Sequence, residues 1–319
     1  MAIRARTSRG MPNRLTLPVG PTRAPLPAER ATMQFVEDRV VARASAAVSS
    51  LAEDLGLEVN EVIVIHNSNK LALRLLPCDT FARTALVGEE VAAFEVRIAR
   101  RLAAVPAPIA DLDPRVEPRV HERDGFAVTF WSYYGDATEL PAPGEYADAL
   151  HRLHAAMRSV EIEAPHFTER VAEAQRLLTR RHETPALADD DRVLLLETLH
   201  TAGRTIARSG NADQLLHGEP HSGNLLGSPA GPVFIDLETG CRGPVEFDLA
   251  HVPDEVSGLY PGVDHDLLQE CRRLVLAMVA AWRWDARDEY PDGLGHAVRI
   301  LGLLRSGPPW PTFDALPSR

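Results

Sequence analysis

Residues 215–226 read LLHGEPHSGNLL, and residues 233–238 read VFIDLE. Within this span the carboxylate of Glu219 precedes the amide of Asn224 by five positions, and a second carboxylate, Asp236, follows twelve positions later at the end of an apolar run. Magnesium-dependent phosphoryl transfer needs a group that orients the attacking hydroxyl and then two metal ligands. The order and spacing of these side chains therefore predict a small-molecule kinase.

The segment from His217 to Asn224 is predicted to be a loop. Two glycines and a proline within these eight residues exclude a regular helix. Leucine pairs at 215–216 and 225–226 flank the segment, as expected for a loop that holds catalytic side chains between packed elements. Glu219 is then placed to accept a hydrogen bond from a substrate hydroxyl and to orient it for attack.

Asn224 and Asp236 are predicted to bind magnesium, because this ion prefers oxygen ligands and fills its other positions with water and substrate phosphates. Asp236 follows the buried-strand pattern VFI and so emerges at a strand end. Glu238 would point to the same side if the extended conformation continues, and would reach the metal through water. The alternative, that these polar residues only cap turns, explains less, because loop chemistry, spacing and the following strand agree.

His217 and His221 have two interpretations. As zinc ligands they would make the protein a zinc hydrolase, but Pro220 breaks the helix that a helical two-histidine zinc motif requires. No PCxxC segment follows either, as it does in nucleobase deaminases. Support of the loop through hydrogen bonds to its backbone is therefore the preferred interpretation, and zinc hydrolysis stays an alternative.

The composition restricts the class of protein. A chain of 319 residues with 45% hydrophobic content can bury a large core in one two-lobed domain or two domains. Its net charge of -11 does not favour a nucleic-acid partner. The three cysteines form no CxxC pair, and the sequence holds no membrane-length apolar run. No secretory signal is expected, because the arginines near residue 1 are not followed by an apolar h-region. A cytoplasmic protein is expected, with no membrane partner, as a monomer or a homodimer.

Hydrophobic periodicity predicts two parts after a disordered basic tail at residues 1–33. The first part, 34–131, is expected to hold a small sheet and a crossing helix. Its predicted elements are a helix from residue 34, strands at 58–66 and 71–76 joined by a turn, a helix at 89–104, and a hairpin of strands at 116–121 and 126–131.

The second part, 145–306, is expected to be mainly helical and to contain the catalytic loop. A connector at 132–144 precedes it and a tail at 307–319 follows it. Its predicted helices span roughly 145–158, 166–181, 187–209, 264–285 and 293–305.

The loop resembles that of the aminoglycoside phosphotransferase and choline kinase-like family, which is related in fold to protein kinases. That loop usually reads H-G-D-x-H-x-x-N, followed by an apolar strand and I-D; here it reads HGEPHSGN and then Ile235-Asp236. The resemblance implies that Glu219 is the catalytic base and that Asn224 and Asp236 hold magnesium. Asp248 takes the position of the family's structural aspartate, which steadies the catalytic loop.

The sequence departs from the family pattern at the position of the catalytic base. Glu219 stands in place of the usual aspartate, so its carboxylate lies about an ångström further along a more flexible stem. The turn at 66–69, in the place of a glycine-rich nucleotide loop, has no glycine. These two departures keep open the alternative of a non-catalytic, nucleotide-binding pseudokinase.

For the nucleotide, the resemblance implies that Arg74 on the third strand of the family's sheet binds phosphate. Glu95 on the following helix is its expected ion-pair partner, and Ser68 and Asn69 would donate to phosphate from the turn. The segment Phe130-Trp131-Ser132-Tyr133 would contact the base of ATP or GTP, although its aromatic residues are equally well explained as core.

The resemblance thus implies an α+β, two-lobed protein-kinase-like fold with the nucleotide in the cleft between the lobes. The expected reaction moves the γ-phosphoryl group of ATP or GTP to a hydroxyl of a small molecule. An antibiotic such as an aminoglycoside, a sugar, an amino alcohol and another natural product all fit. Acidic residues between Asp254 and Asp266 would suit a cationic acceptor, although solvated loop charge is the preferred explanation for them.

Overall fold

The computed structural model describes residues 6–7, 27–67, 70–88, 90–135, 140–312 and 315, with side chains from Asp38 onward except that of Glu90. Ser68 and Asn69 lie outside the described residues, and so does most of the predicted tail. The chain divides into two compact units, one of residues 1–100 and 110–135 and the other of residues 101–109 and 136–319. The predicted α+β class is confirmed, with a largely antiparallel sheet in the first unit and mainly helices in the second.

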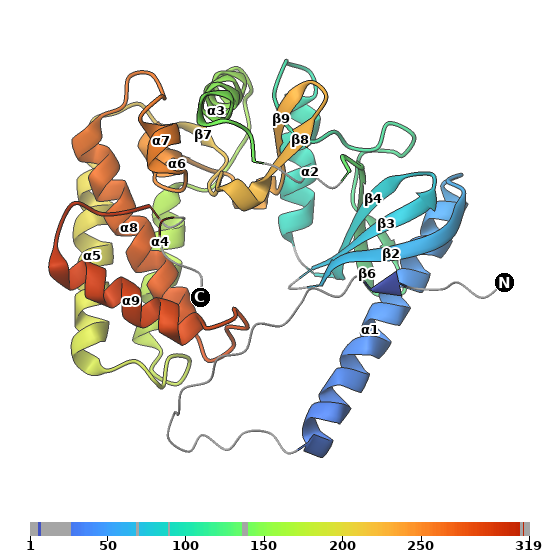
Figure 1. The fold of residues 1–319 in the computed structure, drawn as a ribbon, viewed down its shortest axis with the longest axis horizontal. Helices are drawn as coiled ribbons and strands as arrows, with labels where there is room; N and C mark the ends of the chain where they lie inside the picture. The colour runs from blue at the N-terminus through green and yellow to red at the C-terminus, as the bar shows by residue number, and fades with distance from the viewer. Residues whose placement is uncertain are drawn as a thin grey trace. The chain divides into compact units, whose positions relative to one another are not determined.

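The first unit is built on a six-stranded sheet in the order β1-β2-β3-β4-β6-β5 (Figure 1). The short β1 pairs in parallel with β2, and the other neighbours pair antiparallel. The elements of this part of the chain are β1 (Arg6–Thr7), α1 (Pro27–Asp54), β2 (Val59–Asn67), β3 (Leu71–Pro77), β4 (Thr80–Leu86), α2 (Glu90–Leu102), β5 (His121–Arg123) and β6 (Phe126–Ser132).

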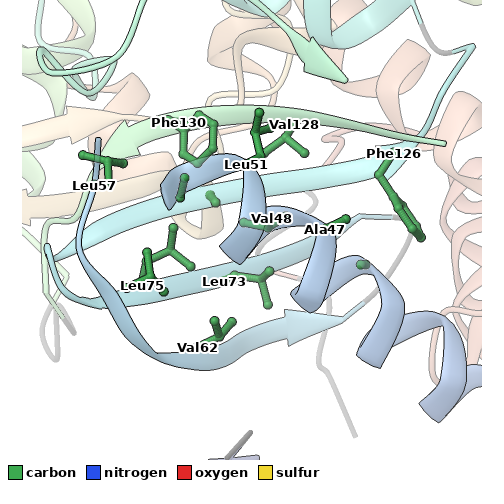
Figure 2. Packing of buried hydrophobic residues seen from close by; sticks show 14 of the residues in the cluster. Ala47, Val48, Leu51, Leu57, Val62, Leu73, Leu75, Phe126, Val128 and Phe130 are labelled. Carbon is green, nitrogen blue, oxygen red and sulfur yellow. The ribbon is translucent and has the colours of Figure 1, made fainter. Parts of the chain in front are cut away.

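Helix α1 packs against one face of this sheet and supplies much of the core (Figure 2). Its apolar residues, among them Val48 and Leu51, recur every three or four positions and therefore lie along one side of the helix. In β3, Leu73 and Leu75 alternate with outward-facing residues, as the two-residue period of a strand requires, and both are fully buried. The helix begins at Pro27, earlier than expected, and proline suits the first helical position.

Strand β4 is not among the elements predicted from the sequence, and it lies between β3 and β6 in the sheet. Its core-facing residues are Thr80, Ala82 and Thr84, which are small or polar although all three are buried. A strand with so little apolar surface gives only a weak periodic signal. The buried Thr80 hydroxyl donates to the Asp113 carboxylate at 2.8 Å, so hydrogen bonding replaces apolar contact there.

The second predicted hairpin is partly wrong. The strand expected at residues 116–121 is present only from His121 to Arg123, because Pro118 cannot donate a backbone hydrogen bond to a sheet. The turn itself is found at Asp124 and Gly125, which both have positive φ (53° and 84°). Two such residues form the turn that matches the twist of an antiparallel hairpin.

In the second unit, α8 contacts α4, α5, α6 and α9 and is buried along most of its length (Figure 1). Two small strand pairs, β7 with β10 and β8 with β9, interrupt the helices. The elements are α3 (Pro143–Arg158), α4 (Phe167–Thr179), α5 (Asp189–Ala207), β7 (Gln214–Leu216), η1 (Ser222–Asn224), β8 (Leu225–Ser228), β9 (Gly231–Phe234), η2 (Leu237–Thr239), β10 (Cys241–Gly243), α6 (Val245–Leu249), α7 (Asp254–Ser257), α8 (His265–Arg283) and α9 (Gly293–Ser306).

The segment that follows α2 belongs to the second unit rather than to the first. The Phe234 N–H at the end of β9 donates to the Pro108 carbonyl at 2.8 Å, and Ile109 forms a bridge with the same residue. A backbone contact across this sequence separation cannot be read from local patterns. Within the described part of the chain, no helix has the length and apolar character that a membrane span needs.

Leu73→Ala is expected to lower the free energy of unfolding by about 2–5 kcal/mol, because it leaves a cavity between β3 and α1. Leu86→Ala is the matched control, since Leu86 is 65% exposed, and should change the same quantity by less than about 0.5 kcal/mol. Urea unfolding of both variants measures the difference. Equal effects would contradict the assignment of this core.

Candidate active site

The predicted catalytic loop follows β7 and is folded against η2. Gly218 has a φ of +93°, and a Cβ at this position would collide with the Thr239 carbonyl. Only glycine meets both conditions, the left-handed backbone and the close approach. The Thr239 hydroxyl also donates to the His217 carbonyl at 3.2 Å, so the two segments are held at a fixed separation.

Asp248, in α6, is the buried anchor of this loop. Its carboxylate accepts the N–H groups of His217 and Gly218 at 2.9 and 2.8 Å and also the Nε2–H of His154 at 2.9 Å. Burial alone would raise the pKa of Asp248, but these hydrogen bonds and the neighbouring histidines lower it below its usual value. A buried anion thus fixes two consecutive amides of the loop.

His217 and His221 both contact the loop backbone. The His217 ring donates from Nε2 to the Ile235 carbonyl at 2.9 Å, and its Nδ1 accepts the Glu219 N–H at 3.4 Å. Burial lowers the pKa of His217, which keeps the ring neutral in this arrangement. His221 Nδ1 accepts the Gly223 N–H at 3.1 Å and caps η1. Among the described residues, no group of three or more His, Cys, Asp or Glu side chains is arranged to hold a metal ion.

Glu219 lies in the loop with about a quarter of its side chain exposed. Arg170 of α4 donates from Nη2 to Glu219 Oε1, and it also donates from Nη1 to the carbonyl of the preceding residue, Gly218, at 3.3 Å. Burial would raise the pKa of Glu219, but the charge of Arg170 outweighs this and holds the pKa below its usual value. Glu219 is therefore an anion at neutral pH, available to accept a hydrogen bond.

Asn224 is joined to both sides of the site by hydrogen bonds. Its Nδ2 donates to the Glu219 carbonyl at 2.9 Å, and its own carbonyl accepts the Ile235 N–H at 3.0 Å. Among the described residues, no hydrogen bond uses the Asn224 side-chain oxygen. Asp236 follows directly with φ 65° and ψ 57°, a left-handed conformation that a non-glycine residue adopts at a cost and that is common at functional sites.

The side-chain oxygens of Asn224 and Asp236 fit magnesium, since an amide oxygen and a carboxylate are hard oxygen ligands. The extended conformation on which the predicted position of Glu238 depends does not continue after Asp236, because the chain turns into η2, which contains Glu238. A same-side position derived from strand geometry therefore does not apply to Glu238.

In the first unit, the expected pair of Arg74 and Glu95 is wrong, because Glu95 pairs with Arg83. Arg83 Nη1 lies 2.8 Å from Glu95 Oε1, and only 3% of the Glu95 side chain is exposed. Arg74 instead contacts Asp79 at 2.7 Å and lies 3.9 Å from the centre of the Tyr133 ring. The error arose because β4, which carries Arg83, was not predicted.

Both arginines nevertheless lie on the same face of the sheet. Arg83 is opposite Ala72, and Arg74 is opposite Phe81, in the antiparallel pairing of β3 with β4. Residues opposite each other in such a pair share a face. This face points away from α1. Leu73, between Ala72 and Arg74 in β3, points toward α1, and neighbouring residues of a strand point to opposite faces.

The predicted base-contacting segment has mixed surroundings. Phe130 belongs to the core beneath α1, as the alternative explanation expected. Trp131 is buried, and its Nε1–H donates to the Thr129 hydroxyl at 3.0 Å. The Ser132 N–H donates to the Asp111 carbonyl at 2.9 Å, and Tyr133 is half-buried beside Arg74. Contact of this segment with a nucleotide stays a prediction.

Several residues around the loop were not predicted. The Tyr146 hydroxyl in α3 donates to the Pro220 carbonyl, and His154 joins Asp248 to Tyr260. His251, one turn beyond Asp248, is buried, and no described residue forms a hydrogen bond with its Nε2. Tyr146 and His154 lie in α3 and Arg170 lies in α4, whereas His251 and Tyr260 lie in turns after α6 and α7, and no local pattern identifies any of them.

A family comparison identifies the chain. Residues 56–290 match the model of the phosphotransferase enzyme family, which covers most of the sequence. The chain belongs to this phosphotransferase family. A sequence search of curated proteins gave no match.

Solved structures with the same fold are phosphotransferases. Amicoumacin kinase hAmiN, in complex with AMP-PNP, Ca2+ and Ami, has a TM-score of 0.63 and 11% identity over 81% of this chain and 92% of its own. The GDP complex of aminoglycoside 2'-phosphotransferase-IIIa has a TM-score of 0.58 and 13% identity over 83% of this chain and 98% of its own. Choline kinase LicA from Streptococcus pneumoniae has a TM-score of 0.58 and 15% identity over 87% of this chain and 100% of its own. At these identities the likeness shows the fold, and the protein-kinase-like fold implied by the resemblance is confirmed.

His251 makes the stability of this phosphotransferase family member depend on pH. Burial lowers the pKa of His251 from 6.5 to about 4, despite the nearby Glu219 charge. Between these values the unfolded chain takes up a proton that the folded protein does not, so falling pH destabilises the fold by up to about 3 kcal/mol.

His251→Gln should therefore gain stability relative to the unmutated protein as pH falls from 6.5 to about 4. Urea unfolding at several pH values measures this gap, which is the difference in the free energy of unfolding between the variant and the unmutated protein. His182→Gln is the control, because the His182 side chain is 80% exposed, and its gap should stay constant. A constant gap for His251→Gln would contradict a buried neutral ring.

Proposed function

We propose that this protein transfers the γ-phosphoryl group of a nucleoside triphosphate to a hydroxyl of a small molecule, with Mg2+ as cofactor. The observation that carries the proposal is that hydrogen bonds join Asn224 to Glu219 and to Ile235, the residue before Asp236, in a chain of the phosphotransferase family. The carbonyl of Glu219 binds the Asn224 amide, and Asn224 binds the residue before Asp236. These bonds support the assignment of Glu219, Asn224 and Asp236 to one site.

Glu219 is the proposed base. An anionic carboxylate with a lowered pKa is a weak proton acceptor, but it accepts a hydrogen bond well. The loose transition state of phosphoryl transfer needs little proton abstraction before the new bond forms. Glu219 would therefore mainly orient the acceptor hydroxyl and take its proton late in the reaction.

Asn224 and Asp236 would hold magnesium through the amide oxygen and the carboxylate. When bound, the ion neutralises charge on the phosphate oxygens. Asp236 is supported in this role by its left-handed backbone, a conformation that turns the residue out of the strand direction of β9. His217, His221 and Asp248 keep this part of the loop in place.

Arg83 is the stronger candidate for the phosphate-binding arginine, in preference to Arg74. The carboxylate of Glu95 is almost fully buried beneath it, and burying an ion pair is costly enough that such pairs often have a functional role. Arg74 pairs with Asp79, whose side chain is 51% exposed, and an ion pair of that kind contributes little to stability.

The acceptor is proposed only as a small molecule with a free hydroxyl. The solved relatives include an amicoumacin kinase, an aminoglycoside phosphotransferase and a choline kinase. The acidic cluster gives little support to a cationic acceptor, because Asp254 pairs with Arg272 at 2.6 Å and Asp264 caps α8. The choice between ATP and GTP, a cytoplasmic location and a monomeric or dimeric state stay predictions. The family match gives no support to a non-catalytic pseudokinase.

Magnesium-dependent transfer from ATP or GTP to one acceptor is expected in a panel of aminoglycosides, sugars, amino alcohols and other hydroxylated natural products. Glu219→Gln and Asp236→Asn should each lower kcat by about 100-fold or more. Glu161→Gln and Asp190→Asn, at exposed positions away from the site, should leave it unchanged. Transfer that survives both site variants would contradict the proposed roles.

The two arginines can be separated by nucleotide binding. Arg83→Met should raise the Kd for ATP or GTP by about tenfold or more, because it removes a charged hydrogen-bond donor to phosphate. Arg74→Met, of the same size and charge change, should raise it by less than about threefold. Isothermal titration calorimetry measures both. The reverse order would favour Arg74 as the phosphate ligand.

A further inference from the structure

Glu219 needs an additional restraint that an aspartate would not. Compared with aspartate, it has one more rotatable bond between the backbone and the carboxylate, and each free rotor broadens the positions that the carboxylate can take. The loop fixes only its backbone, through the His217 ring at the N–H and the Asn224 amide at the carbonyl. A side chain elsewhere in the fold must hold the carboxylate itself if it is to meet a hydroxyl in one geometry.

Arg170 has the geometry for this restraint. Its guanidinium donates through Nη1 to the Gly218 carbonyl and through Nη2 to the Glu219 carboxylate. The guanidinium is planar and rigid, so two donors on two different acceptors fix the carboxylate relative to the loop backbone. A lysine, with a single charged nitrogen, could not hold both acceptors in one plane.

Arg170 is itself held by the helices of the second unit. The neighbouring Val171 and, one turn and two turns on, Ala174 and Leu178 are buried, which fixes the rotation of α4. The guanidinium lies 5.2 Å from the centre of the Trp282 ring in α8, a cation–π contact. Only 14% of the Arg170 side chain is exposed, so solvent screens its pair with Glu219 weakly.

We propose that Arg170 is a positioning residue that fixes the Glu219 carboxylate for the acceptor hydroxyl and so offsets the extra rotatable bond of glutamate at the base position. This inference rests on the proposed function. It assigns to α4 a part in the reaction that the motif does not contain. It also explains how a glutamate can serve where a shorter carboxylate is usual.

Steady-state kinetics test this proposal, with the acceptor that the panel of aminoglycosides, sugars, amino alcohols and other hydroxylated natural products yields. Arg170→Met keeps a long apolar stem beside Trp282 but removes both donors, and should lower kcat by about 10- to 100-fold, as expected for a displaced catalytic group. KM for nucleotide and acceptor should change by less than about threefold, because Arg170 acts only through Glu219. Arg170→Lys should retain an intermediate kcat.

Arg176→Met is the matched control. Arg176 lies on the same helix, its side chain is 58% exposed, and it forms an ion pair only with Glu173 among the described residues, at 3.8 Å. Its kcat should equal that of the unmutated protein. Thermal unfolding of all variants separates a loss of fold from a loss of positioning.

A double-mutant cycle gives a readout that a merely structural arginine would not change. In Glu219→Asp the shorter carboxylate retreats from Arg170, so adding Arg170→Met should lower kcat by less than about threefold further. The proposal is overturned if Arg170→Met has the kcat of the unmutated protein. It is also overturned if Arg170→Met causes the same loss with and without the Glu219→Asp substitution.

A crystal structure of Arg170→Met supplies a test that needs no acceptor. Glu219 is expected in one rotamer in the unmutated protein and in several, or in a displaced one, in the variant. An unchanged Glu219 side chain would overturn the positioning role. If the unmutated protein phosphorylates no acceptor, the proposed function fails. If it is active and Arg170→Met leaves kcat unchanged, only the positioning role of Arg170 is overturned.

Discussion

The loop at residues 217–224 depends on one buried anion, the carboxylate of Asp248. It accepts two consecutive backbone amides of the loop and the ring of His154, and it has no exposure to solvent. A buried carboxylate without these donors would cost several kcal/mol, so the loop, α3 and α6 stabilise each other only as a set. Gly218 can then approach η2 closely, and Glu219 leaves the loop in a defined direction.

The charges around Glu219 suit a transfer reaction better than a reaction that begins with proton abstraction. Arg170 lowers the pKa of Glu219, which makes it a poorer base, while it restrains the position of the carboxylate. In a loose transition state the nucleophile gains charge late, so position contributes more than basicity. By our proposal the same arginine weakens Glu219 as a proton acceptor and still favours phosphoryl transfer.

Local patterns were enough for the loop and not enough for the sheet. The loop, its glycines and the strand before Asp236 could be predicted because their chemistry lies within about twenty residues of sequence. Arg83 and Glu95 could not be paired, because β4 buries threonines and alanine and so lacks the apolar alternation on which strand prediction rests. The position expected for Glu238 failed for a related reason: a left-handed residue at Asp236 ends the strand geometry.

The contact of the Phe234 amide with the Pro108 carbonyl has a consequence for biosynthesis. The two residues are 126 positions apart (234 − 108), so a ribosome that adds about 5–20 residues per second exposes Pro108 many seconds before its partner exists. The part of the second unit at residues 101–109 therefore leaves the ribosome long before the strand with which it pairs. During synthesis the backbone around Pro108 has no strand to pair with until β9 has emerged, and only then can its hydrogen bond to Phe234 form.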